Sequence, residues 1–177
     1  ATPSTPIEVG DMLTVNVTVN ENATGFVKIT INGKDYFEKL DGGNATFEIF
    51  GIPFGKYRNI PVEYLGDDYF NETSTKISFD VNYKDYVVNT KVSNVKYGEN
   101  VTIYTALPGD VTEEVIFVIN GTAYPNIPVV NGVAELTLPN LDVGEYPVVV
   151  VYPGDKKYDY KVNITSFNVT ATDDWTI

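Results

Sequence analysis

The residues of this chain that could carry chemistry are dominated by one motif, Asn-X-Thr, the acceptor sequence for N-linked glycans. With 17 asparagines and 24 serines and threonines among 177 residues, random placement predicts about two to three such motifs. Eight are present, and all end in threonine: Asn16, Asn22, Asn44, Asn71, Asn100, Asn120, Asn163 and Asn168. Most fall on the polar phase of a predicted strand or in a predicted turn, whereas Asn163 shares the phase of apolar residues. The surplus predicts glycosylation, with the ordinary abundance of Asn and Thr on β surfaces as the alternative.

Two Gly-Asp turns are the candidates for binding a metal ion. Gly66-Asp67-Asp68 and Gly154-Asp155 lie between predicted strands, and clustered carboxylates supply the oxygen ligands that Ca²⁺ prefers. Neither turn has the regular spacing of a known calcium loop, so the sequence favours plain turns and no cofactor. The acidic residues Asp80, Asp85 and Glu63 offer a second calcium hypothesis, a metal at the predicted domain junction.

Four aromatic residues beside the same turns are candidates for ligand contact. They are Tyr69, Phe70, Tyr158 and Tyr160. Aromatic rings next to polar loops often hold carbohydrate or protein ligands. Packing at the edge of a core is the alternative interpretation of all four.

The absent residue types exclude several classes of chemistry. The chain has no histidine, no cysteine and no glutamine, which removes the commonest general base, the thiol nucleophiles and both ester and thioester cross-links. No lysine is clearly directed into a core beside an acid, as an isopeptide bond would need. We therefore expect no enzyme and no catalytic residues.

The net charge restricts the partners. It is −12, from 12 basic and 24 acidic side chains, and a polyanion of this strength repels nucleic-acid backbones and anionic lipid headgroups. No apolar run approaches the roughly 20 residues of a membrane span. We expect no nucleic-acid partner and no direct membrane insertion.

The candidate residues sit in a sequence that repeats at a shift of about 88 residues. Val27–Gly33 matches Val115–Gly121, and Gly55-Lys56-Tyr57 matches Gly144-Glu145-Tyr146 at a shift of 89. The drift predicts one extra residue after the second Asn-Gly turn and one between Tyr57 and Tyr64, where it would form a β-bulge near Pro61. Matches this widely spaced, with apolar positions in phase, indicate a true repeat.

Each copy is patterned as β-strands. Alternating apolar residues such as Leu13, Val15 and Val17 predict strands with one buried face. The Asn-Gly dipeptides after Ile31 and Ile119 predict type I′ hairpins, and no stretch has a helical period. The continuous apolar run Val148–Val151 predicts a central strand.

About seven strands in roughly 88 residues predict an immunoglobulin-like β-sandwich. The fold class is therefore all-β, with two tandem immunoglobulin-like domains. The expected boundaries are 1–82, with its first strand truncated, 83–171, and 172–177 as a linker and the start of a possible next repeat. Tyr57 and Tyr146 are predicted to form tyrosine corners, in which the hydroxyl binds upstream backbone.

The pattern resembles the immunoglobulin-like (Big-type) tandem repeats of bacterial and archaeal surface proteins. The residues that carry the resemblance are Val95–Thr102, Val118–Gly121, Leu138–Tyr146 and Val151–Asp155. They look most like the repeats of adhesin-like proteins of methanogenic archaea. Phe54–Pro61 departs from the pattern.

The resemblance implies an extracellular glycoprotein at the cell surface, anchored to the cell wall or membrane through other parts of a longer protein. It implies a stalk or adhesion module that mediates or presents cell attachment. Expected partners are neighbouring repeats of the same chain and glycans or proteins of other cells. The alternative is a lectin-like or protein-binding module that uses aromatic residues of the F–G and B–C loops.

Overall fold

The computed structural model describes residues 1–173 and divides the chain into two compact units, Ala1–Lys84 and a second that begins at Asp85. Both units are all-β, and the described residues form no helix long and apolar enough to cross a membrane. Residues 174–177, which include the predicted start of a next repeat, lie outside the described part.

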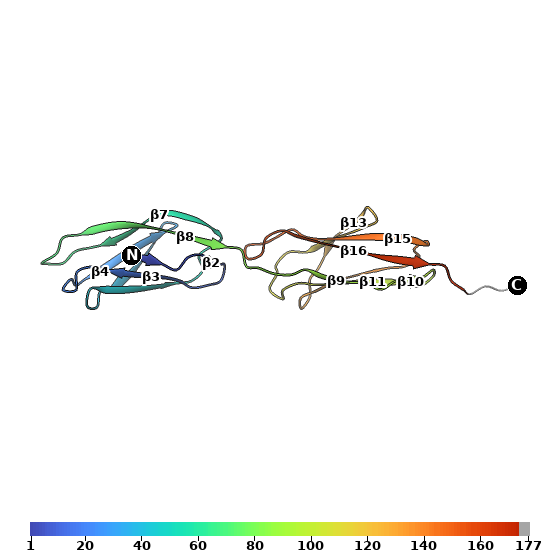
Figure 1. Cartoon of the computed structure of the whole chain (residues 1–177), viewed down its shortest axis with the longest axis horizontal. Helices are drawn as coiled ribbons and strands as arrows, with labels where there is room; N and C mark the ends of the chain where they lie inside the picture. The colour runs from blue at the N-terminus through green and yellow to red at the C-terminus, as the bar shows by residue number, and fades with distance from the viewer. Residues whose placement is uncertain (174–177) are drawn as a thin grey trace. The chain divides into compact units, whose positions relative to one another are not determined.

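Unit 1 is a sandwich of a three-stranded and a five-stranded sheet (Figure 1). The smaller sheet has the order β1 (Thr2–Pro3), β3 (Leu13–Thr18) and β6 (Asn44–Ile49). The larger sheet has the order β2 (Ile7–Glu8), β8 (Thr73–Asn82), β7 (Gly55–Tyr64), β4 (Phe26–Ile31) and β5 (Lys34–Lys39). The two inner faces enclose one core, in which the large buried side chains are Leu13, Ile29, Ile31, Phe47 and Phe79.

Unit 2 repeats this arrangement. Its smaller sheet has the order β9 (Asn89–Lys91), β11 (Val101–Ala106) and β14 (Val133–Leu138). Its larger sheet has the order β10 (Val95–Lys96), β16 (Lys161–Thr170), β15 (Gly144–Tyr152), β12 (Val115–Ile119) and β13 (Thr122–Ile127). Its core is built around Ile103, Phe117, Tyr152 and Phe167.

The first strand of each unit is split between the two sheets. β1 pairs antiparallel with β3, and β2 then runs parallel to β8. β9 and β10 do the same with β11 and β16. Among residues 1–173, counting each split strand once gives seven strands per unit, so the predicted fold class, two tandem immunoglobulin-like sandwiches, is confirmed.

The local predictions at the hairpins are also confirmed. Asn32 and Gly33 join β4 to β5 with φ of 50° and 77°, and Asn120 and Gly121 join β12 to β13 with φ of 47° and 84°. Two consecutive positive φ angles are what a type I′ turn requires, and Asn and Gly adopt them at the lowest cost. The same short turn therefore closes both hairpins.

The two predicted extra residues are β-bulges. The register of β7 on β8 shifts between Tyr57 and Ile60, just before Pro61, and Asn59 there has φ of 54°. In unit 2 the register of β13 on β12 shifts where Asn126 has φ of 62°. β15 pairs with β16 without interruption, and it lies in the middle of its sheet as predicted.

Candidate functional site

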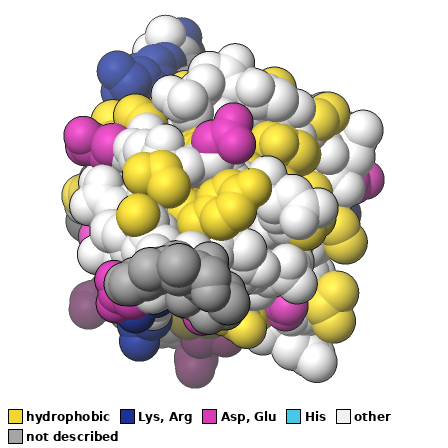
Figure 2. All heavy atoms as spheres, turned by 90° about the vertical axis from the view of Figure 1, so that its right-hand side faces the viewer, with side chains coloured by type: hydrophobic (Ala, Val, Ile, Leu, Met, Phe, Trp, Pro, Cys, Tyr) yellow, Lys and Arg dark blue, Asp and Glu magenta, His cyan; other side chains and the backbone are white. Residues whose placement is uncertain are grey.

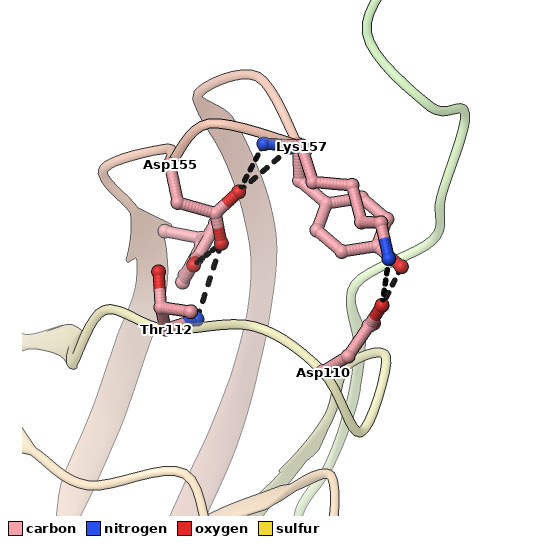
Figure 3. Close-up of polar contacts among 6 residues, drawn as sticks. Asp110, Thr112, Asp155 and Lys157 are labelled. Atoms are coloured by element: carbon pink, nitrogen blue, oxygen red, sulfur yellow. Dashed lines mark hydrogen bonds and ion pairs between the residues drawn. The ribbon is translucent and has the colours of Figure 1, made fainter. Parts of the chain in front are cut away.

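A polar network in unit 2 ties the loop between β15 and β16 (residues 153–160) to the segment before β12 (Figure 3). Asp155 is at its centre. Its Oδ1 accepts hydrogen bonds from the backbone N–H groups of Lys157 and Tyr158, both at 2.8 Å. Its Oδ2 accepts from the backbone N–H of Thr112 at 3.1 Å and from the hydroxyl of Tyr152. The carboxylate of Asp155 thus stabilises its own loop and also binds the segment before β12.

Asp110 adds a second attachment between the same two segments. Its Oδ2 lies 2.5 Å from Nζ of Lys157, and its Oδ1 accepts a 2.6 Å hydrogen bond from the hydroxyl of Tyr158 (Figure 3). These two bonds, that from Lys157 first, lower the pKa of Asp110 to about 2. Asp110 is therefore charged at neutral pH and holds the loop electrostatically.

The acidity of the network is set by burial and hydrogen bonding together. Burial by itself raises the pKa of Asp155, but bonds from Tyr152, Tyr158, Lys157 and Thr112 outweigh it, and the pKa falls below its usual value. Burial raises the pKa of Tyr152 and of Tyr158 to about 12. The carboxylates are charged acceptors and the phenols are neutral donors, so the network has no group poised to exchange protons near neutral pH.

Unit 1 uses the same device with fewer partners. Oδ1 of Asp67 accepts from the backbone N–H groups of Tyr69 and Phe70 at 2.8 and 2.7 Å. Oδ2 accepts from the backbone N–H of Thr24 at 2.8 Å and from its hydroxyl at 3.0 Å. These bonds, those from Thr24 first, hold the pKa of Asp67 well below its usual range. In both units the aspartate reaches a threonine 43 residues earlier.

The glycine before each aspartate is required by this geometry. Gly66 and Gly154 have φ of 83° and 93°, where a side chain is strained. A Cβ on Gly66 would lie 3.0 Å from the backbone nitrogen of Glu72, and one on Gly154 would lie 2.9 Å from that of Tyr160. Each Gly-Asp turn therefore depends on a glycine backbone conformation and on the hydrogen bonds of its aspartate within the same domain.

The geometry gives the calcium hypothesis no support. Asp67 and Asp155 direct both carboxylate oxygens at donors of their own domain, and within residues 1–173 no group of three or more acidic side chains is placed to hold a metal ion. Glu63 forms an ion pair with Lys28 at 3.0 Å, and Asp80 forms one with Arg58 at 2.8 Å. Glu63 and Asp80 lie at opposite ends of the β7–β8 ladder, so these two carboxylates are not gathered in one site.

The four candidate ligand-contact aromatics fall into two groups. Tyr158 is 2% exposed in the core of unit 2, and Phe70 at the equivalent position packs against the core of unit 1. These two rings therefore have a packing role. Tyr69 and Tyr160 lie on the surface, 91% and 58% exposed.

Tyr86 connects the beginning of unit 2 to the β15–β16 loop through packing and a hydrogen bond. Its ring is buried against Tyr152 and Tyr158, and its hydroxyl donates to the backbone carbonyl of Asp159. Nζ of Lys161 binds the backbone carbonyl of Tyr86 and lies 4.7 Å from the centre of its ring. Burial raises the pKa of Tyr86 to about 12. The strand pattern alone did not indicate this attachment.

Both predicted tyrosine corners are present. The hydroxyl of Tyr57 donates to the backbone carbonyl of Pro53 at 2.8 Å, and that of Tyr146 donates to Asp142 at 2.7 Å. Their rings stack on Phe79 and on the equivalent Phe167. The two tyrosines are therefore structural.

Seven of the eight sequon asparagines are exposed and only Asn163 is half-buried. Asn163 lies in β16 opposite the buried Val150. Asn16 and Asn44 accept hydrogen bonds from Thr46 and Thr18 across the β3–β6 ladder. A glycan could therefore be attached at seven of the eight asparagines without unfolding the domain, and glycosylation itself stays a prediction.

An apolar surface on unit 2 was not anticipated from the strand pattern. Outward-facing residues of three adjacent strands form two cross-strand rows, Ile116–Val151–Val162 and Val118–Val149–Ile164. We call these six residues the aliphatic face. The run Val148–Val151 indicated a central strand, but Val149 and Val151 point away from the core that holds Val148 and Val150. Comparing the sequences of the two copies position by position would have revealed this apolar surface.

A second hydrophobic area lies at the end of unit 2 where β16 finishes. Hydrophobic side chains gather on this end (Figure 2), around a shallow hollow lined by Tyr97, Asp142, Val143, Ala171 and Thr172. Tyr97 and Val143 are 53% and 57% exposed. The hollow has few polar groups that could orient a small ligand.

Comparison with protein-family models gives a match for unit 2. Residues 88–172 match the model of the bacterial Ig-like domain (group 3), a range that contains all strands from β9 to β16. The match supports a bacterial Ig-like domain in unit 2. Unit 1 lies outside the matched range, but it has the same sheet orders. No curated protein sequence matches the chain.

Similar solved structures include tandem and surface-protein domains. The titin domains Z1Z2 in complex with telethonin are 13% identical, with a TM-score of 0.49, over 97% of this chain and 96% of that one. A putative membrane anchored protein from Corynebacterium diphtheriae is 12% identical, with a TM-score of 0.47, over 96% and 53%. A 1.5-MDa bacterial ice-binding adhesin is 15% identical, with a TM-score of 0.40, over 93% and 60%. At these values the likenesses carry no argument about function.

Proposed function

We propose that this chain is a stalk and adhesion module of a large extracellular cell-surface protein, whose immediate task is to extend that protein and present its binding parts. The observation that carries the proposal is the closure of the β7–β8 and β15–β16 loops. In both units an aspartate in this loop is fully engaged by its own domain. Loops built this way hold their shape, and both carboxylate oxygens of Asp67 and of Asp155 are used within the domain.

The surface fits an extracellular setting. The net charge of −12 opposes clumping, and seven accessible sequons would add glycans in a host that glycosylates them. The bacterial Ig-like match of residues 88–172 supports a surface protein. The sequence resemblance to adhesin-like repeats of methanogenic archaea makes an archaeal surface adhesin the finer form of the proposal.

The partners expected for such a module are neighbouring repeats and, through the presented parts, glycans or proteins of other cells. An enzymatic role has no support, because the chain lacks histidine and cysteine and its charged networks have structural partners. Nucleic acid is a poor partner for a surface of this charge.

A second candidate function rests on Tyr69 and Tyr160. Both are strongly exposed beside the tip of a loop, where an aromatic ring can stack on a sugar or enter a protein pocket. This is the lectin-like or protein-binding alternative. The two tyrosines occupy different loop positions, because Phe70 and Tyr158 are the equivalent pair.

Two measurements on the full chain test these functions, and the second separates them. Under force in a single-molecule experiment, a stalk module unfolds in two separate events, one for each unit. On a glycan array and on intact cells, it shows no saturable binding. Saturable binding that Tyr69→Ala or Tyr160→Ala abolishes, while the exposed control Tyr104→Ala retains it, would establish the alternative and overturn the stalk proposal.

A further inference from the structure

The aliphatic face of unit 2 is an ordered array of side chains. Ile116 of β12 is the cross-strand partner of Val151 of β15, which in turn pairs with Val162 of β16. The second row, Val118, Val149 and Ile164, lies two residues away along each strand. Ile164 is 72% exposed and Val162 is 37% exposed. The exposed Ala123, opposite Val118 in β13, extends the second row to a fourth strand.

Five of the same six positions of unit 1 are polar, and the sixth is Pro61. At a shift of 88 residues, the first row of unit 2 corresponds to Lys28, Glu63 and Ser74, which are also cross-strand partners. The second row corresponds to Thr30, Pro61 and Lys76. Lys28 and Glu63 form an ion pair at 3.0 Å, as on an ordinary solvated sheet face. Because the cores of the two units agree, the fold does not require an apolar outer face.

The chemistry of the face restricts what can bind it. Its six members are all aliphatic and β-branched, with no charge, no side-chain hydrogen-bonding group and no aromatic ring. Sugars need polar groups or ring stacking, and nucleic acid and metal ions need charge. None of the six is a sequon asparagine, and the sequon Asn168 lies on the same outward side of β16, four residues beyond Ile164. A second flat apolar protein surface is the matching partner.

We propose that this partner is the same face of a second copy of the chain, so that unit 2 associates laterally with itself. Two copies related by a two-fold axis would bring identical rows of β-branched side chains together, and such an interface needs no complementary charges. The net charge of −12 makes two copies repel elsewhere. They can approach most closely through the face where the charged residues of unit 1 are replaced by Ile116, Val151 and Ile164.

The size of the face sets the strength of the contact. The six residues lie on three strands about 4.8 Å apart and in two rows about 7 Å apart, so they offer roughly 200 Å² per copy. A pair therefore buries about 400 Å², well below the roughly 1,200 Å² at which stable interfaces begin. The dimer of this fragment is weak and transient. On a crowded cell surface, many such contacts between neighbouring molecules would add through multivalency.

Sedimentation equilibrium of the full chain tests the proposal. The wild type is expected to associate reversibly with increasing concentration. Association is expected to strengthen as salt is raised, because salt screens the repulsion between acidic copies. The triple variant Ile116→Lys/Val151→Glu/Ile164→Lys installs residues of unit 1, including its ion pair. It is expected to raise the dissociation constant at least tenfold.

The matched control is Tyr104→Lys. It changes the net charge by the same amount as the triple variant, at a residue 48% exposed on β11 in the other sheet, and it is expected to associate like the wild type. Circular dichroism checks that each variant is folded. If the triple variant does not fold, the single variant Ile164→Lys at the most exposed member must show the weakening.

Three results would overturn the inference. They are a wild type that stays monomeric at millimolar concentration in high salt, a triple variant that associates as well as the wild type, and a control that loses association equally. Binding to neutral lipid vesicles without self-association would also overturn it and would assign the face to a membrane. The inference is independent of the stalk proposal, since a ligand-binding module could carry the same face.

Discussion

Replacing Asp155 with alanine should destabilise unit 2 and leave unit 1 unchanged. The substitution removes one acceptor from three backbone N–H groups and from the hydroxyl of Tyr152, whose side chain is fully buried. Backbone groups near the surface can turn to water, but the phenol loses its charged acceptor and keeps only the N–H of Glu113, from which it accepts at 3.2 Å. A lost bond of this kind costs about 2–3 kcal/mol.

For a domain of this size, that loss corresponds to a melting temperature lower by about 10–20 °C. Asp155→Asn should cost less, because Oδ1 remains as an acceptor for Lys157 and Tyr158. Its amide nitrogen, however, would face the N–H of Thr112, and two donors cannot bond. The expected order of stability is therefore wild type, then asparagine, then alanine.

Native-state hydrogen exchange read by mass spectrometry can assign the loss to a unit. Peptides from β15 and β16 should exchange faster in the alanine variant, while those from β7 and β8 should not change. The exposed neighbour Lys156 provides a control, and Lys156→Ala should leave both units unchanged. A loss in unit 2 below about 0.5 kcal/mol, no larger than ordinary surface substitutions give, would refute the assignment of Asp155 as a loop anchor.

The same difference should depend on pH. Because the pKa of Asp155 is lower in the folded state than in the unfolded state, its charged form stabilises the fold above the unfolded value of about 4. That contribution is lost as pH falls through the folded pKa. The stability gap between wild type and Asp155→Ala should therefore shrink in acid. A gap that is constant from neutral pH to acid would contradict the charged hydrogen bonds.

The remaining predictions concern the tyrosines, calcium and glycans. Tyr146→Phe removes the 2.7 Å bond to Asp142 but keeps the stacked ring, and it should cost unit 2 about 1 kcal/mol in urea unfolding. Burial raises the pKa of three tyrosines of unit 2, Tyr86, Tyr152 and Tyr158, to about 12. The stability of unit 2 that is present below pH 10 should therefore fall as pH rises toward 12. Absorbance at alkaline pH should show these three tyrosines titrating later than the others. Calcium and EDTA should give the same melting temperature, and a calcium-dependent rise would restore the metal hypothesis. Protein from the native host should exceed the polypeptide mass by whole glycans, and an unmodified mass there would remove the glycosylation prediction.

Much of the scaffold could be predicted because it depends on local patterns. Alternating apolar residues define strands and their buried face, and Asn-Gly defines the hairpin turns, where both residues need positive φ. The drift in the 88-residue shift predicted the β-bulge near Pro61 and the extra residue that forms a second bulge in β13. The tyrosine corners at Tyr57 and Tyr146 likewise involve bonds that span only four residues. Such features are encoded within short segments, so the sequence alone determines them.

Tertiary structure decided what depends on distant partners. From the sequence alone, Asp67 and Asp155 could be turn residues or calcium ligands. The fold brings Thr24 and Thr112, each 43 residues earlier, within hydrogen-bonding distance of them. Phe70 and Tyr69 are adjacent and both aromatic, yet only the former faces the core. A continuous apolar strand has no polar phase to mark its outward side, so the strand pattern alone did not identify Val149 and Val151 as surface residues. The sequence thus determined two tandem sandwiches, and the packing of sheets and loops determined which side chains remain free to meet a partner.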